Sequence, residues 1–245
     1  MARLSHRTQE DVSLDTVWMR SPKCRSHTNV GPLGPAELVS PVLDYDNRGQ
    51  WTKELRSIFN VIAKAPFSAL PTEFCATQVH VSLVPDWTVS QIRSLAQAVL
   101  YYSEPFERLA ERLKRSDKAL VKPNRVAWGK ATITEALQIL DEASRAWDIV
   151  RLMNPRGPGV RLDRYCHWSF WPLVGLVVLK DRGVATTGDD GSADAYDDEA
   201  RETMHKKLGT VEFRLPPGSR TVEEAIMWVD LANLFVRAAV QRTVP

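Results

Sequence analysis

The segment C-A-T-Q-V-H-V-S at residues 75–82 constrains the fold most, because its apolar and polar side chains alternate. Successive side chains of a strand point to opposite faces. Gln78, His80 and Ser82 therefore share one face, and Val79 and Val81 share the other. This alternation is typical of an antiparallel sheet with one packed face. The polar face is either solvated or part of a binding site, and this segment alone favours solvation.

A second strand is predicted at 209–215, where Thr210, Glu212 and Arg214 share one face. In one interpretation Glu212 and Arg214 form an ion pair in water, which contributes little stability. In the other, Glu212 binds a metal and Arg214 holds a phosphate or carboxylate. The E-x-R pattern alone favours the exposed pair.

The remaining pattern mixes strands and helices without a regular strand–helix–strand rhythm, so we expect the α+β class. Thr88 and Gln91 form a capping-box pattern at the start of one helix, which Pro105 ends or kinks. The other expected helices cover residues 51–64, 132–153 and 221–241, and a further helical segment runs to about residue 115. Strands are expected near 14–19, at 36–43 with Pro41 interrupting, and within 164–180.

Length and composition predict one domain over residues 1–245, with an irregular segment at 1–35 and a flexible acidic insertion at 186–204. The net charge of +2 gives no field that would recruit nucleic acid or a membrane. Three cysteines without a C-x-x-C pair argue against a cysteine zinc site and against a disulfide framework. No secretory signal or membrane-length apolar run is present, so we expect a cytoplasmic protein. The sequence carries no signal for an oligomeric state.

Several isolated residues have both a functional and a simpler structural interpretation. Glu37 is a metal ligand or an exposed residue of an edge strand. Asn124 and Arg125 could meet a phosphate, although a solvated loop is the simpler interpretation. Tyr165 could line a pocket, and Gly218 could offer backbone N–H groups to an anion, but a packed aromatic ring and a plain turn are favoured.

Six segments, in this order, resemble the amidoligases of fungi and bacteria. The resemblance spans Asp11 to Ala239. The segments are E-L-V-S-P (37–41), C-A-T-Q-V-H-V-S (75–82), P-N-R (123–125), R-Y-C-H-W-S-F (164–170), T-V-E-F-R-L-P-P-G-S (210–219) and W-V-D-L-A-N-L-F-V-R-A-A (228–239).

This family is placed with glutamine synthetase, so the resemblance implies a curved, mainly antiparallel sheet with helices packed on one side. It also implies ATP-dependent and Mg²⁺-dependent joining of a small-molecule or peptide carboxylate to an amine. Carried over by position, the implied metal ligands are Glu37, Gln78 and Glu212. The implied catalytic residues are His80 and Arg214, and the implied ATP-binding residues are Asn124, Arg125 and Arg214.

Three departures from the family pattern qualify the implied activity. No G-x-E-x-E-F strand precedes D-V-S-L (11–14), Gln78 replaces the first histidine of H-V-H, and Ser169 replaces the asparagine of W-N-F. These departures indicate an N-terminally truncated chain or a degenerate family member. The alternative function is therefore a catalytically inactive module that binds a ligand or, through the acidic segment 188–199, a protein partner.

Overall fold

The structure is a computed structural model that describes residues 12–18, 38–64, 75–113, 121–154, 165–173 and 209–241. The structure contains helices and an antiparallel sheet, which confirms the α+β class. The strands are β1 (Val12–Trp18), β2 (Leu38–Asp44), β3 (Thr77–Leu83), β4 (Trp168–Ser169) and β5 (Val211–Phe213). The helices are α1 (Arg48–Lys64), α2 (Val89–Tyr101), α3 (Ser103–Arg112), α4 (Ile133–Glu142), α5 (Ala146–Met153) and α8 (Val222–Gln241), with 3₁₀ turns at Asn124–Trp128 and Trp171–Leu173.

The five strands form one sheet in the order β2-β1-β3-β5-β4, and every adjacent pair is antiparallel. The segment predicted to be irregular apart from short strands thus contributes β1, next to the central strand. Pro41 lies in β2 at one edge of the sheet, where a residue without an N–H is tolerated. Strand β4 forms the other edge.

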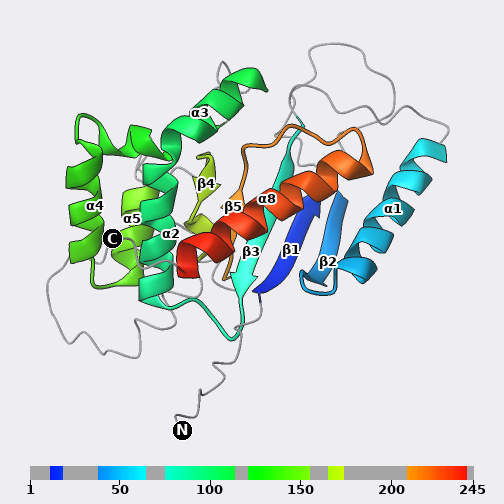
Figure 1. Cartoon of the computed structure of the whole chain (residues 1–245), viewed down its shortest axis with the longest axis horizontal. Coiled ribbons are helices and arrows are strands. Elements are labelled where there is room, and N and C mark those ends of the chain that lie inside the picture. Colours follow the sequence, from blue (N-terminus) through cyan, green and yellow to red (C-terminus); the bar gives the residue numbers. More distant parts are fainter. Residues whose placement is uncertain are drawn as a thin grey trace, which may run out of the picture.

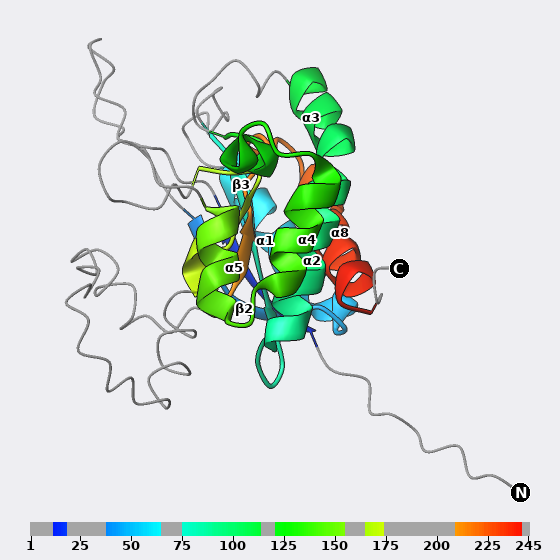
Figure 2. The same cartoon turned by 90° about the vertical axis from the view of Figure 1, so that its left-hand side faces the viewer.

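One face of the sheet packs against helices, as the alternation in β3 predicts. Val79, Val81, Val211 and Phe213 are fully buried in the hydrophobic core on this face. Helix α8 crosses this face in front of β3 and β1 (Figure 1), with α1 and α2 beside it. Helices α4 and α5 pack against α2 beyond the end of the sheet (Figure 2). The burial of these side chains is the main force that holds the layers together.

Capping boxes define the first residues of two helices. The Thr88 hydroxyl accepts the N–H of Gln91, and the Gln91 side chain accepts the N–H of Thr88. Thr132 and Glu135 make the same reciprocal pair at the start of α4. Both boxes satisfy N–H groups that the helices leave unpaired. Pro105 lies in the first turn of α3, where its missing N–H costs nothing.

The single helix predicted over 132–153 is wrong, because the chain leaves helical geometry between α4 and α5. Ala143 has φ −67° and ψ 109°, which is extended backbone. Its carbonyl accepts Arg93 Nη2 from helix α2 at 2.7 Å instead of a helical N–H. After the break, Arg145 forms a two-bond ion pair with Asp148 in the first turn of α5. The hydrogen bond from Arg93 of α2 thus takes the place of the backbone hydrogen bond that would continue the helix.

Other differences concern the ends and faces of elements. The strand predicted at 209–215 is limited to Val211–Phe213, and the only strand within 165–173 has two residues. Leu234 of α8 is 58% exposed, so it lies on the side of this helix that faces away from the core. Residues 174–180, the insertion 186–204 and Glu37 lie outside the described residues. No helix in the described ranges is long and apolar enough to cross a membrane.

Candidate functional site

The polar face of β3 and β5 carries a cluster of four side chains, Gln78, His80, Glu212 and Arg214, which we call the polar cluster. His80 pairs with Glu212 in the register between the two strands. Gln78, Glu212 and Arg214 are only 4%, 5% and 8% exposed. The interpretation of this face as solvated is therefore wrong, as is that of an exposed Glu212–Arg214 pair. The structure brings together four of the seven predicted site residues.

Hydrogen bonds join three members of the polar cluster into a closed ring. Arg214 Nη1 donates to Glu212 Oε1 at 2.5 Å. The Gln78 amide finds partners for both its ends when its nitrogen donates to Glu212 Oε1 at 2.9 Å and its oxygen accepts Arg214 Nη2 at 3.2 Å. The amide therefore bridges an acid and a base, which fixes both ionised side chains. Glutamine at position 78 suits this ring because it is both a donor and an acceptor.

His80 is held between Glu212 of β5 and Thr210, which immediately precedes this strand. Its Nδ1 lies 3.0 Å from Thr210 Oγ1, and its Nε2 lies 3.6 Å from Glu212 Oε1. The imidazole side chain is 12% exposed. An Nε2 directed toward a carboxylate can take up a proton and keep it beside a negative charge. The arrangement is therefore able to accept or supply a proton next to Glu212.

Arg214 is held in place both by its guanidinium and by its backbone. Its guanidinium lies over the Tyr165 ring, with Cζ 5.3 Å from the ring centroid. Its backbone N–H donates to His167 O at 2.9 Å. Among the described residues, its buried Nε has no hydrogen-bond partner. A buried N–H without an acceptor is costly, and an anionic oxygen would satisfy it. Tyr165, considered from the sequence as a pocket residue, therefore supports Arg214.

The polar cluster does not by itself fit a Mg²⁺ site. Glu212 is the cluster's single carboxylate within the described ranges, and Arg214 already neutralises it. Mg²⁺ prefers several hard oxygen ligands in octahedral geometry. No group of three His, Cys, Asp or Glu side chains that could hold a metal occurs in the described part of the chain. Glu37, the third predicted ligand, is not among the residues described.

The register of β1 adds a position that the sequence did not single out. Asp15 pairs with His80 across β1 and β3, and Val17 pairs with Gln78. Asp15, His80, Glu212 and Ser169 therefore occupy one row across four strands. Alternation within V-S-L-D-T-V-W could have indicated the face, but only the strand order places Asp15 in this row.

The two predicted phosphate-contacting residues lie outside the polar cluster. Asn124 is 2% exposed, and its side-chain amide bonds with the backbone of Trp168. Arg125 is exposed in the 3₁₀ turn Asn124–Trp128. These contacts give Asn124 a structural role in the fold, and its assignment to ATP binding stays a prediction.

The turn P-P-G-S does not present free N–H groups to an anion. The N–H of Gly218 donates to Cys75 O at 3.0 Å, and the N–H of Ser219 donates to Thr77 Oγ1 at 3.0 Å. The turn is therefore used to attach the segment before α8 to the start of β3. This outcome agrees with the simpler interpretation of a plain turn.

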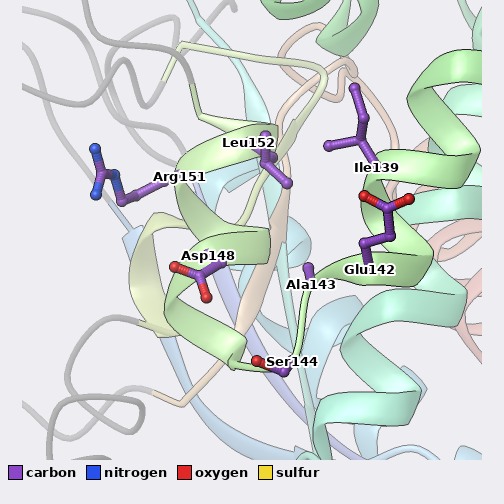
Figure 3. A pocket seen from close by; sticks show the side chains of 7 residues that line it. All are labelled: Ile139, Glu142, Ala143, Ser144, Asp148, Arg151 and Leu152. Carbon is purple, nitrogen blue, oxygen red and sulfur yellow. The ribbon is translucent and has the colours of Figure 1, made fainter.

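Two surface hollows occur apart from the polar cluster. The first lies between α4 and α5 and has a volume of about 480 Å³; Figure 3 shows Arg151 directed away from Ile139 and Glu142. The second hollow lies between α1 and α8 and is bordered by two ion pairs, Arg48–Asp230 and Arg56–Glu223. Neither hollow contains a predicted site residue. The residues around the first are Ile139, Glu142, Ala143, Ser144, Asp148, Arg151 and Leu152.

Comparison with known proteins bears on the first part of the chain. A family model described as "putative amidoligase enzyme" matches residues 5–118. This match confirms the resemblance to the amidoligases over β1, β2, α1, β3, α2 and α3, and it includes Gln78 and His80. The match ends before β5, which supplies Glu212 and Arg214. No curated protein and no solved structure matches the chain.

Proposed function

We propose, from the amidoligase match and the polar cluster, that this chain is a carboxylate–amine ligase that forms an amide bond. The observation that carries the proposal is the burial of Glu212, Arg214 and His80 together on the polar face of the sheet. Charged groups are rarely buried unless they are paired, and functional sites concentrate them. We further propose a glutamine-synthetase-like arrangement of the sheet. ATP would phosphorylate the carboxylate and leave as ADP, and the amine would then displace the phosphate as the amide bond forms.

The residues of the polar cluster have complementary roles in such a reaction. The Arg214 guanidinium donates to an oxygen of the acid substrate, while the ion pair with Glu212 and the Tyr165 ring keep the guanidinium in place. His80 Nε2 accepts the proton that the amine nitrogen loses when the amide bond forms. Glu212 then stabilises the protonated imidazole from 3.6 Å. Binding and proton transfer are thus assigned to neighbouring strands.

Turnover assays test this proposal directly. The protein is incubated with Mg²⁺ and ATP, and ADP release is measured for mixtures of carboxylates and amines. We expect release that needs both organic substrates and that falls at least about 100-fold in Glu212→Gln, because removing a preorganised charge costs a few kcal/mol of transition-state stabilisation. Glu223→Gln is the matched control, because its side chain is 66% exposed on α8. Equal turnover in wild type and Glu212→Gln would contradict the assigned role.

A second function, ligand binding without catalysis, is favoured by one observation. Arg214 already neutralises Glu212, and Gln78 stands where the family commonly has a histidine. A site arranged in this way binds an anion without needing a metal. Thermal-shift titration separates the two functions, because a ligand that binds the folded state raises the melting temperature. Stabilisation by ATP only with Mg²⁺ favours the ligase, whereas stabilisation by small carboxylates alone favours the binding module.

A further inference from the structure

Strand β4 is an edge strand whose outward backbone groups are satisfied by side chains. Among the strands that the structure describes, none lies on the side of β4 away from β5. Unpaired N–H and C=O groups of an edge strand are costly when they are buried. Trp168, Ser169 and Phe170 are each 0% exposed. Their outward groups must therefore be paired within the fold.

Asn124 pairs with β4 in the way a neighbouring strand would. Its Oδ1 accepts the N–H of Trp168 at 3.0 Å, and its Nδ2 donates to Trp168 O at 2.7 Å. These two hydrogen bonds have the pattern that a hydrogen-bonded residue pair makes between antiparallel strands. The same Nδ2 also lies 3.3 Å from Met153 O, near the end of α5. One side chain thus connects an edge strand with a helix end.

Asn154 continues the same edge. It is fully buried, and its Oδ1 accepts the N–H of Phe170 at 2.9 Å. Its Nδ2 lies 3.5 Å from Ser169 Oγ, and its own N–H donates to Val150 O of α5. Asn124 and Asn154 together therefore replace the missing neighbour of β4 over Trp168–Phe170.

We infer that Asn124 and Asn154 are positioning residues for the polar cluster. Strand β4 is the outer support of β5, because Ser169 pairs with Glu212 and Trp168 pairs with Phe213. The rings of Trp168 and Phe213 also stack, with centroids 4.5 Å apart. If the outer groups of β4 lose their partners, β4 separates from β5, and Glu212 loses the neighbour that fixes it opposite His80. In this role both asparagines act through β4 and not through a contact with substrate.

Hydrogen exchange of the whole protein tests the positioning role. Asn124→Ala leaves two backbone groups of Trp168 without partners, and we expect exchange in β4 and β5 to accelerate roughly tenfold or more, because such groups are costly to leave unpaired. In the same variant, the rate of hydrogen exchange in α8 should rise by a smaller factor than the rate in β5. Ile149→Ala is the control: this residue of α5 is fully buried, and its removal weakens the core while leaving both asparagines in place. If Asn124→Ala and Ile149→Ala lower the melting temperature equally and also accelerate hydrogen exchange in β5 equally, the inference is overturned.

A second measurement connects the asparagines with the site. The catalytic part of the inference rests on the proposed ligase function. In wild-type protein with confirmed turnover, Asn124→Ala should lower kcat/KM at least tenfold, and Ile149→Ala should leave it near the wild-type value. Equal kcat/KM losses would overturn the positioning role. Wild-type protein without turnover would contradict the proposed function alone, and the exchange experiment would still decide the role of the asparagines.

Discussion

His80 lies directly opposite Glu212 in the register between β3 and β5, with His80 Nε2 3.6 Å from Glu212 Oε1. Both side chains are on the face of the sheet opposite the hydrophobic core. A position opposite in register has its Cβ within about 5.5 Å, so short side chains meet without strain. The pair is thus a consequence of the strand register, and changes that alter the register will alter its geometry.

Removal of Arg214 is expected to destabilise the protein strongly. In Arg214→Met the carboxylate of Glu212 stays buried without its cation, which costs about 3–5 kcal/mol of unfolding free energy. Urea denaturation measures this loss. In the double variant Arg214→Met/Glu212→Gln we expect recovery of part of the stability, because no unpaired charge remains. A double variant as unstable as the single variant would show that packing, and not charge, accounts for the loss.

An exposed ion pair provides the comparison for that prediction. Arg56 and Glu223 contact each other at 2.8 Å, but both side chains are more than half exposed. Water and salt screen such a pair, so Arg56→Met should change the unfolding free energy far less than Arg214→Met does. Denaturation under the same conditions as for Arg214→Met checks the difference. A loss as large as that of Arg214→Met would contradict the role of burial.

The capping box of α4 predicts a pH-dependent contribution to stability. Hydrogen bonds from the backbone and side chain of Thr132 lower the pKa of Glu135 below its usual value of 4.5. A carboxyl whose folded-state pKa is lowered stabilises the fold above its unfolded-state pKa, and the effect disappears as the pH falls through the folded-state pKa. We expect Thr132→Ala to be less stable than wild type at pH 7 and to differ less at pH 3. NMR titration of the Glu135 carboxyl should give a higher pKa in Thr132→Ala.

The phenol of Tyr45 predicts a contribution to stability that depends on pH in the alkaline range. Burial, followed by the charge of Asp230 and the hydrogen bond to it, raises the pKa of Tyr45 above 10.0. A raised pKa in the folded state gives stability below the unfolded-state pKa that is lost as the pH rises through the folded-state value. Asp230→Asn should therefore lower the pKa of Tyr45, which ultraviolet difference titration against Tyr45→Phe can measure. An unchanged titration curve would contradict the role of Asp230.

Helix α8 allows a test of its two faces. Leu234 is 58% exposed, whereas Val229 is fully buried. Leu234→Gln should change stability by no more than about 0.5 kcal/mol, because surface substitutions rarely matter. Val229→Ala removes two buried carbon atoms and should cost about 2 kcal/mol. Thermal denaturation of both variants checks the assignment of the faces.

Local patterns predicted the elements that depend on neighbouring residues. The period-two alternation found β3 and β5, and the Thr88–Gln91 pattern located the first residue of α2. The break between α4 and α5 could not be predicted in this way, because the Arg93 side chain that bonds to Ala143 O comes from helix α2. A continuous helical pattern therefore does not predict a continuous helix where a side chain from another element replaces a backbone hydrogen bond.

The candidate site was predictable as a set of residues, but its environment was not. The shared faces of Gln78 with His80 and of Glu212 with Arg214 follow from strand alternation. The burial of these residues depends on parts of the chain distant in sequence, so the sequence alone favoured an exposed face. Asn154 gave no signal at all, because its contact with Phe170 arises only when α5 packs beside β4.

The two asparagines at the edge of β4 also bear on self-association. An open edge strand can pair with the same strand of a second molecule, and the contact can then repeat into aggregates. Asn124 and Asn154 occupy the groups of Trp168 and Phe170 that such pairing would use. Burial of residues 168–170 and these two side chains therefore together leave this edge of the sheet without backbone groups that another copy of the chain could pair with.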